Sequence, residues 1–298
     1  YRYRTVLLLV ARQSGKSLVM TVVALYMMLV AAQGELVLGT AQDLDTSEGT
    51  WGDAVEMVEA VPALSRLVKQ VVKVNGKKSL VLANGSKWKV AAAKRTGGRG
   101  KSAALVLLDE LREHLNYEAW NAITNTTIAR EEAQVWGVSN AGDARSIVLK
   151  ELREKAIAQK DDPGARTLIC EWSAPDDCPV GEPGVPIESD PEVLAGGLQA
   201  NPSIGHTVTL EAIESSRATS PEAGYRTENL CQWVTAMERG PFDEESIESC
   251  VDLESVIDEA SPLVVSVDTA RDRSVSWVAV AGWRPDGVPH VEVIARRA

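Results

Sequence analysis

Short runs of consecutive apolar residues recur through the first 175 residues of the chain, and many are separated by segments with apolar residues at helical spacing. A short continuous apolar run is typical of a strand that is buried on both faces of a sheet. The pattern predicts helices at residues 17–32, over most of 43–70, and at 144–159. Strands that alternate with helices form a mostly parallel sheet covered on both sides, so the expected fold class is α/β. The predicted strands are residues 5–10, 35–40, 71–74, 79–82, 88–92, 104–108, 134–139 and 166–172.

The pattern changes after residue 174. Residues 175–191 are rich in proline and acidic residues, which is typical of a linker or a surface excursion. The expected elements that follow are helices at 191–198, 210–218 and 221–235, then strands at 262–268, 274–282 and 290–294 with a Pro-Asp-Gly hairpin turn. We therefore predict three parts: a first domain at residues 1–174, a linker or helical subdomain at 175–260, and the start of a further, incomplete domain at 261–298.

Composition supports a folded chain of one large or two ordinary domains. The sequence has 298 residues, of which 45% are hydrophobic, enough for a sizeable core. Because it starts without methionine inside a strand-like segment, we expect a fragment of a longer protein whose first domain lacks N-terminal residues. No apolar run reaches the roughly 18 residues of a membrane span, and no signal-peptide pattern is present. We therefore expect no membrane partner.

The cysteines, histidines and charges limit the possible functions. The four cysteines form no CxxC pair and the three histidines lie far apart, so neither a zinc site nor a disulfide framework is expected. A reducing cytoplasm is the default location for such a chain. The formal net charge of −11 argues against a non-specific nucleic-acid binder, so any such contact must use a local basic patch. Residues 73–101 hold most of the clustered positive charge and are the candidates for such a contact.

The sequence LLLVARQSGKSLVM at residues 7–20 joins the first predicted strand to the first predicted helix. Gly15, Lys16 and Ser17 match the end of the phosphate-loop pattern, although Val10 occupies the position of its first glycine. Backbone N–H groups at such a helix start attract phosphate, while the lysine contacts the β- and γ-phosphates and the serine binds Mg²⁺. The alternative is a solvated lysine at an ordinary strand–helix turn.

Two further strands end in polar residues. The apolar run at 105–108 ends in Asp109 and Glu110, which could hold Mg²⁺ and polarise an attacking water. The alternative for these acids is an ordinary solvated turn. The run at 134–138 ends in Ser139 and Asn140, which could sense the γ-phosphate or could instead cap a helix starting at residue 144. Together with the phosphate loop, the acidic pair predicts a site for ATP.

The order of these motifs resembles the large terminase subunit of tailed bacteriophages. The resemblance rests on ARQSGKS, GGRGKSAALVLLDE, VWGVSNAGD, NPSIG and RTENLCQW, and it runs from about residue 6 to residue 281. RQSGKS is specific because that family replaces the first glycine and places an arginine inside the loop. The resemblance implies an ASCE-type P-loop NTPase, then a helical linker region, then the start of an RNase H-like nuclease domain.

The family resemblance also implies roles for individual residues. Arg12 would contact the phosphates in cis, Glu110 would be the general base, and Asp109 would belong to the metal site. The nucleotide site would comprise Arg12, Gln13, Ser14, Gly15, Lys16, Ser17 and Asp109, with Ser139 and Asn140 as the motif that couples hydrolysis to movement. Arg99, or else Arg95, would act on a neighbouring subunit as an arginine finger, unless this basic loop contacts DNA phosphates instead.

Further implications concern DNA cutting and assembly. Asp268 and Asp272 would bind Mg²⁺ or Mn²⁺ in the nuclease, whose remaining acids are expected after residue 298. The expected partners are double-stranded DNA, a portal protein, a small terminase subunit and further copies of this chain in a ring, expected as a pentamer, in the host cytoplasm. Two alternatives are a helicase or recombination ATPase of the same build, and a nucleotide-binding module that does not hydrolyse ATP.

Overall fold

The computed structural model describes residues 3–41, 44–74, 77–92, 102–234, 244–269 and 275–297. The chain divides into two compact units, Tyr1–Glu238 and Arg239–Ala298. The expected boundary at 174/175 falls inside the first unit, and the one at 260/261 falls inside the second. The three-part division therefore stays a prediction.

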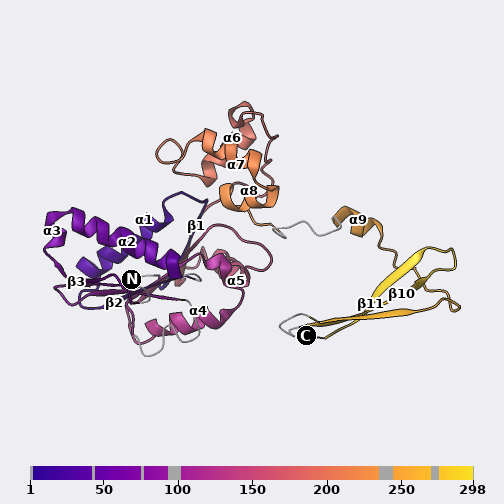
Figure 1. Ribbon diagram of the computed structural model, residues 1–298, viewed down its shortest axis with the longest axis horizontal. Coiled ribbons are helices and arrows are strands. Elements are labelled where there is room, and N and C mark those ends of the chain that lie inside the picture. Colours follow the sequence, from indigo (N-terminus) through magenta and orange to yellow (C-terminus); the bar gives the residue numbers. More distant parts are fainter. Residues whose placement is uncertain are drawn as a thin grey trace. The chain divides into compact units, whose positions relative to one another are not determined.

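The first unit is built on an eight-stranded sheet in the order β3-β4-β5-β2-β6-β7-β1-β8 (Figure 1). Strands β5, β2, β6, β7, β1 and β8 run parallel, while β3 and β4 form an antiparallel edge. This confirms the predicted mostly parallel α/β sheet. The strands are β1 (Thr5–Val10), β2 (Leu36–Ala41), β3 (Val68–Val72), β4 (Ser79–Leu82), β5 (Lys87–Ala92), β6 (Leu105–Asp109), β7 (Gln134–Ser139) and β8 (Thr167–Trp172).

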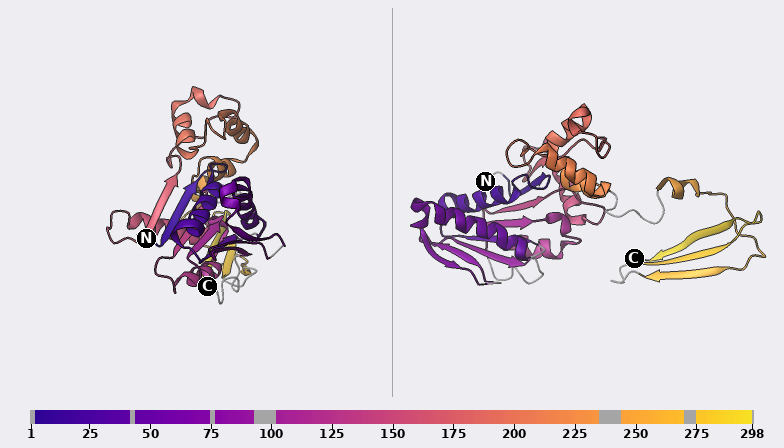
Figure 2. Two further views of the ribbon diagram at one scale, coloured as in Figure 1. Left: turned by 90° about the vertical axis from the view of Figure 1, so that its left-hand side faces the viewer. Right: turned by 45° about the horizontal axis from the view of Figure 1, so that its top comes forward.

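Helices cover both faces of this sheet (Figure 2). One face packs on α1 (Lys16–Tyr26) and α2 (Leu44–Ala60), and the other on α4 (Tyr117–Thr124) and α5 (Ile147–Ala158). Successive side chains of a strand point to opposite faces. Leu8 of β1 accordingly joins the first of these cores, and its neighbours Leu7 and Leu9 join the second. Strands buried on both faces explain why the apolar runs are continuous rather than alternating.

Three further helices, α6 (Pro191–Ala200), α7 (Leu210–Thr219) and α8 (Glu222–Asn229), gather in the first unit (Figure 1). Their side chains hold the proline-rich excursion that precedes them. Arg217 is buried and donates to the carbonyls of Val180 and Val185, while Arg226 donates to that of Cys178. Within the described part of the chain, residues 173–186 contain no regular element, so these side-chain bonds take the place of backbone pairing.

The second unit contains α9 (Glu244–Ser249) and an antiparallel sheet in the order β11-β10-β9. Its strands are β9 (Val264–Thr269), β10 (Ser276–Trp283) and β11 (Pro289–Arg297). Gly287, with φ of 82°, lies in the predicted Pro-Asp-Gly turn between the last two. Every residue of β9 is exposed.

Some element boundaries differ from those predicted. The first helix ends at Tyr26 and continues as a π-helical turn, Met27–Ala31, whose Met28 carbonyl accepts from Asn84 and Ser86. The predicted helical region 43–70 instead ends at α3 (Pro62–Ser65), and β3 begins at Val68. The helix expected at 221–235 stops at Asn229, before Cys231 with φ of 51°. No helix among the described residues is long and apolar enough to cross a membrane.

Candidate active site

Three neighbouring parallel strands bring the predicted motifs to one edge of the sheet. β7 lies between β6 and β1, and all three strands end at the same side. Asp109 ends β6, Ser139 ends β7, and the phosphate loop follows β1. A cavity of about 480 Å³ opens at this edge. Its lining includes Arg12, Gln13, Gly15, Lys16, Ser17, Asp109, Glu110, Ser139 and Asn140, all predicted site residues.

The phosphate loop has the geometry of an anion site. Gly15 has φ of 82° and Gln13 has φ of 62°, so both lie in the left-handed region that turns the chain sharply between β1 and α1. The Lys16 ammonium donates to the carbonyls of Val10 and Ala11, at 3.0 Å each, and burial lowers its pKa. Because α1 begins at Lys16, its free N–H groups and its positive dipole end face the cavity.

Asp109 and Glu110 lie close together at the end of β6. Asp109 is 8% exposed, and burial raises the pKa of its carboxyl to about 6. Glu110 has φ of 50°, and its backbone N–H donates to the Asp109 carboxylate at 2.9 Å. The next residue, Leu111, is fully buried in the core and fixes this turn. Both Asp109 and Glu110 line the cavity.

The oxygen atoms at this edge suit Mg²⁺. Ser17 offers a hydroxyl from the first turn of α1 and Asp109 offers a carboxylate, and both line the same cavity. Mg²⁺ is usually bound through one or two protein oxygens, with water and substrate phosphates completing its coordination. The residues therefore fit a nucleotide-bound Mg²⁺. Among the described residues, no three His, Cys, Asp or Glu side chains form a metal cluster of their own.

Ser139 and Asn140 are joined to neighbouring segments. The Ser139 hydroxyl accepts from the backbone N–H of Arg112 at 3.1 Å. The Asn140 amide donates to the Thr227 carbonyl at 3.2 Å and to the Glu228 carboxylate at 3.0 Å. Because α5 begins at Ile147, the alternative in which these two residues cap a helix at 144 is wrong.

Arg112, Thr207 and Glu228 also line the cavity, and sequence reasoning did not select them. The Glu228 carboxylate lies 2.6 Å from the Arg112 guanidinium and 3.6 Å from that of Arg12. The Arg12 backbone N–H donates to the Glu228 carbonyl at 2.8 Å. The only sequence signal for Glu228 was its place inside RTENLCQW, which points to no chemistry by itself.

Other predicted residues lie elsewhere. Arg95, Arg99 and Asp272 fall outside the described residues. Asp268 is exposed on β9, in the second unit. In the described part of the basic stretch 73–101, Lys78 forms a 2.7 Å ion pair with Glu48. The role of that stretch in binding DNA stays a prediction.

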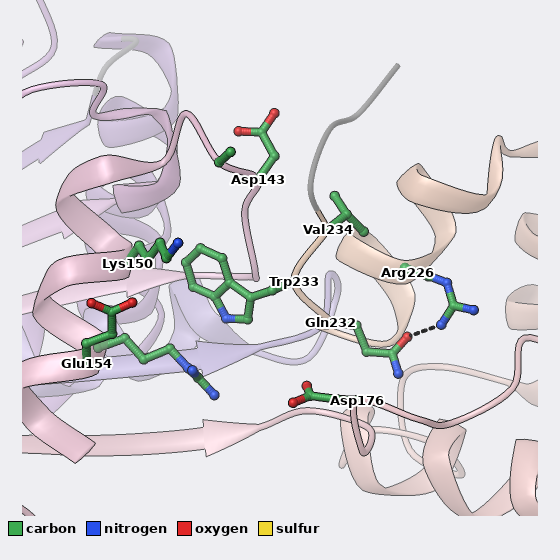
Figure 3. A pocket seen from close by; sticks show the side chains of 10 residues that line it. Asp143, Lys150, Glu154, Asp176, Arg226, Gln232, Trp233 and Val234 are labelled. Atoms are coloured by element: carbon green, nitrogen blue, oxygen red, sulfur yellow. Dashed lines mark hydrogen bonds between the residues drawn. The ribbon is translucent and has the colours of Figure 1, made fainter. Parts of the chain in front are cut away.

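A second cavity, of about 530 Å³, lies between α5 and the segment that follows α8 (Figure 3). Lys150 and Glu154 line it from α5, and Arg226, Gln232 and Trp233 line it from the other side. Arg226 donates to Gln232 at 2.8 Å. This cavity mixes both charges and lacks a phosphate loop, so it is not the candidate nucleotide site. It shares with that site the segment 226–234.

Neither a protein-family model nor a curated protein matches the sequence, whereas solved structures do match the fold. The large terminase of bacteriophage HK97 matches with a TM-score of 0.65 and 20% identity, covering 98% of this chain and 59% of that one. The ATPase domain of the Thermus phage P74-26 large terminase matches with a TM-score of 0.55 and 18% identity, over 78% of this chain and 89% of that one. The chain has the fold of phage large terminases. It spans about three fifths of the length of the HK97 terminase.

A third terminase structure adds information on ligands. The large terminase of a thermophilic bacteriophage has been solved with ADP and with ATP-γ-S, and matches with TM-scores of 0.54 and 0.53. Each match has 12% identity and covers 98% of this chain and 63% of that terminase. At these identities the shared property is the terminase fold, with its mostly parallel sheet and flanking helices.

Proposed function

We propose that this chain is the ATP-hydrolysing part of a DNA-packaging large terminase. The observation that supports it best is the convergence of Lys16, Asp109, Glu110 and Ser139 on one cavity beside the start of α1. The terminase that has been solved with ADP and with ATP-γ-S supports the choice of ATP. The chain covers only part of those proteins, so packaging itself belongs to this proposal.

The residues suggest a division of labour in hydrolysis. The N–H groups of residues 15–17 and the Lys16 ammonium would bind the phosphates. Ser17 and Asp109 would hold Mg²⁺, which neutralises charge that develops on the transferred phosphoryl group. The Glu110 carboxylate would accept a proton from the attacking water. Arg12 has a side chain that is 65% exposed, so it can turn towards the phosphates at little cost in packing.

An ATPase assay with three variants tests this proposal. Glu110→Gln should keep binding ATP-γ-S but lose about 100-fold or more of its phosphate release, since general-base catalysis contributes about that much. Lys16→Ala should lose nucleotide binding. Glu118→Gln, an exposed glutamate in the first turn of α4, is the matched control and should behave as wild type. If the wild type binds ATP-γ-S but hydrolyses ATP no faster than Glu110→Gln does, the chain is a nucleotide-binding module instead.

The remaining assignments extend this proposal to the assembled motor. Arg99, or else Arg95, would act in trans on the nucleotide site of the neighbouring copy in a ring, expected as a pentamer on the portal protein. When Arg99→Ala is mixed with wild type, the ATPase activity should then fall by more than the fraction of variant in the mixture. Asp268 and Asp272 would contribute to a metal-dependent nuclease that needs further acids. We expect this chain alone not to cut DNA. A nicking assay with Mn²⁺ would contradict this if the wild-type chain cut DNA and the Asp268→Ala variant did not.

A further inference from the structure

Glu228 lies in the last turn of α8 and puts a carboxylate on the wall of the candidate nucleotide cavity. Three side chains from the rest of the site reach it: Arg112 at 2.6 Å, Asn140 at 3.0 Å and Arg12 at 3.6 Å. They come from the turn after β6, the end of β7 and the phosphate loop. One acidic side chain therefore joins α8 to all three strand ends that form the site.

A carboxylate in this place opposes a bound triphosphate in two ways. It repels the γ-phosphate, since both are negative and share a partly enclosed cavity. It also occupies Arg112 and Arg12, the two arginines of this lining that a γ-phosphate would otherwise attract. A diphosphate carries less negative charge and does not extend as far. Glu228 should therefore repel it less, and it should compete less for Arg112 and Arg12.

The segment that carries Glu228 is bonded to the strand ends on one side and buried on the other. The Arg12 N–H donates to the Glu228 carbonyl at 2.8 Å and the Asn140 amide to the Thr227 carbonyl at 3.2 Å, while Leu230 and Cys231 are buried in the core. Two open cavities flank residues 226–234: the candidate nucleotide cavity of about 480 Å³, and the cavity of about 530 Å³ that Figure 3 shows. Because Glu228 itself lines an open cavity, a small shift of the last turn of α8 requires less repacking than moving a strand of the sheet.

We propose that Glu228 is a positioning residue that makes the placement of α8 depend on the charge of the bound nucleotide. This inference rests on the proposed ATP site. With ADP or no nucleotide, Glu228 keeps its bonds to Arg112, Asn140 and Arg12, and α8 stays against the strand ends. With a triphosphate, the arginines turn to the γ-phosphate and Glu228 is repelled, which releases the end of α8.

The test compares Glu228→Gln with Glu222→Gln by measuring the affinities of both variants for ATP-γ-S and for ADP. Glu222 lies on the same helix, forms an ion pair with Arg226 and does not line the nucleotide cavity, so it is the matched control. Removing one like charge at this range should tighten ATP-γ-S binding by about tenfold and ADP binding by about twofold or less. The control should change neither. A purely structural role for Glu228 would leave the ratio of the two affinities unchanged.

Hydrogen exchange of the wild-type chain gives a second measurement that needs no variant. ATP-γ-S should speed the exchange of amides in residues 226–232, and ADP should do so less. An unchanged affinity ratio in folded Glu228→Gln, or equal exchange with both nucleotides, would overturn the inference while leaving the ATP site intact. If Glu228→Gln does not fold, the exchange result alone decides. Failure of the wild type to bind ATP-γ-S would overturn the proposed function and this inference together.

Discussion

Gly39 lies in the middle of β2, next to β5, and has no room for a side chain. A Cβ atom at this position would lie 2.8 Å from Nε1 of Trp88. Trp88 is on β5, is fully buried and packs in the core beneath α1 and α2. Its ring is rigid and enclosed, so it cannot yield as the end of a flexible side chain would. We therefore predict that Gly39→Ala destabilises the first unit.

The cost follows from the contact. Van der Waals contact needs roughly 3.4 Å or more, so the ring or the strand must shift by about half an ångström or more, and such overpacking costs about 1–3 kcal/mol. Alanine regains up to about 1 kcal/mol in backbone entropy, which offsets part of it. A net loss of about 1–2 kcal/mol is a large fraction of a typical stability of about 5–15 kcal/mol.

Urea unfolding followed by circular dichroism measures this loss, and a double-mutant cycle identifies its cause. Trp88→Leu removes every ring atom near Gly39 and should cost about 3 kcal/mol alone. If the clash is the cause, Gly39→Ala should hardly change the free energy of unfolding of the Trp88→Leu variant. The coupling energy between the two substitutions should then be about 1 kcal/mol or more. Gly52→Ala in α2 meets no atom within 4 Å and should stabilise by about 0.5–1 kcal/mol. Additive costs of the two core changes would refute the reasoning.

Three further outcomes test other parts of the first unit. Burial raises the Asp109 pKa from 3.8 to about 6, so ionising it costs the folded state on the order of 2–3 kcal/mol at neutral pH. Metal-free Asp109→Asn should then be more stable than wild type at pH 7.5, by a margin that shrinks as the pH falls from 6 to 4, in unfolding titrations at several pH values. Arg217→Met leaves two carbonyls of the excursion 175–191 without their donor. It should lower the free energy of unfolding by about 2 kcal/mol, and limited proteolysis should cut the excursion faster. Ser139→Ala removes the acceptor of the Arg112 N–H and should cost about 1 kcal/mol while lowering the ATPase rate.

The parallel sheet could be predicted because its strands are buried on both faces. Runs such as residues 5–10 and 134–139 match β1 and β7 residue for residue. The polar groups that end three of the strands could be placed together because parallel strands end at a common edge. Local signals thus sufficed to place the loop after β1, Asp109 and Ser139 at one edge of the sheet.

Contacts between distant segments could not be predicted in this way. Glu228 meets Arg112 and Asn140 across 116 and 88 residues, and no periodicity links such positions. Helix α4 was missed because it is only eight residues long, although Asn116 caps it by accepting from the Glu118 N–H. The helix predicted to residue 235 ends early because the chain turns at Cys231, with φ of 51°, and Val234 then bonds to Gly142.

The side-chain bonds between the proline-rich excursion and helices α6–α8 have a mechanical consequence. Gln199 donates to the Ser173 carbonyl, Gln232 to that of Pro175, and Glu214 accepts from Ile187. The excursion and helices α6 and α7, residues 173–219, therefore form one body, and the end of β8 connects it covalently to the sheet. If this body rotates when a nucleotide binds at the candidate site, the excursion should rotate with it without changing its own conformation. Spin labels at residues 182 and 215 should accordingly keep one separation in every nucleotide state, while the distance from either label to α5 changes.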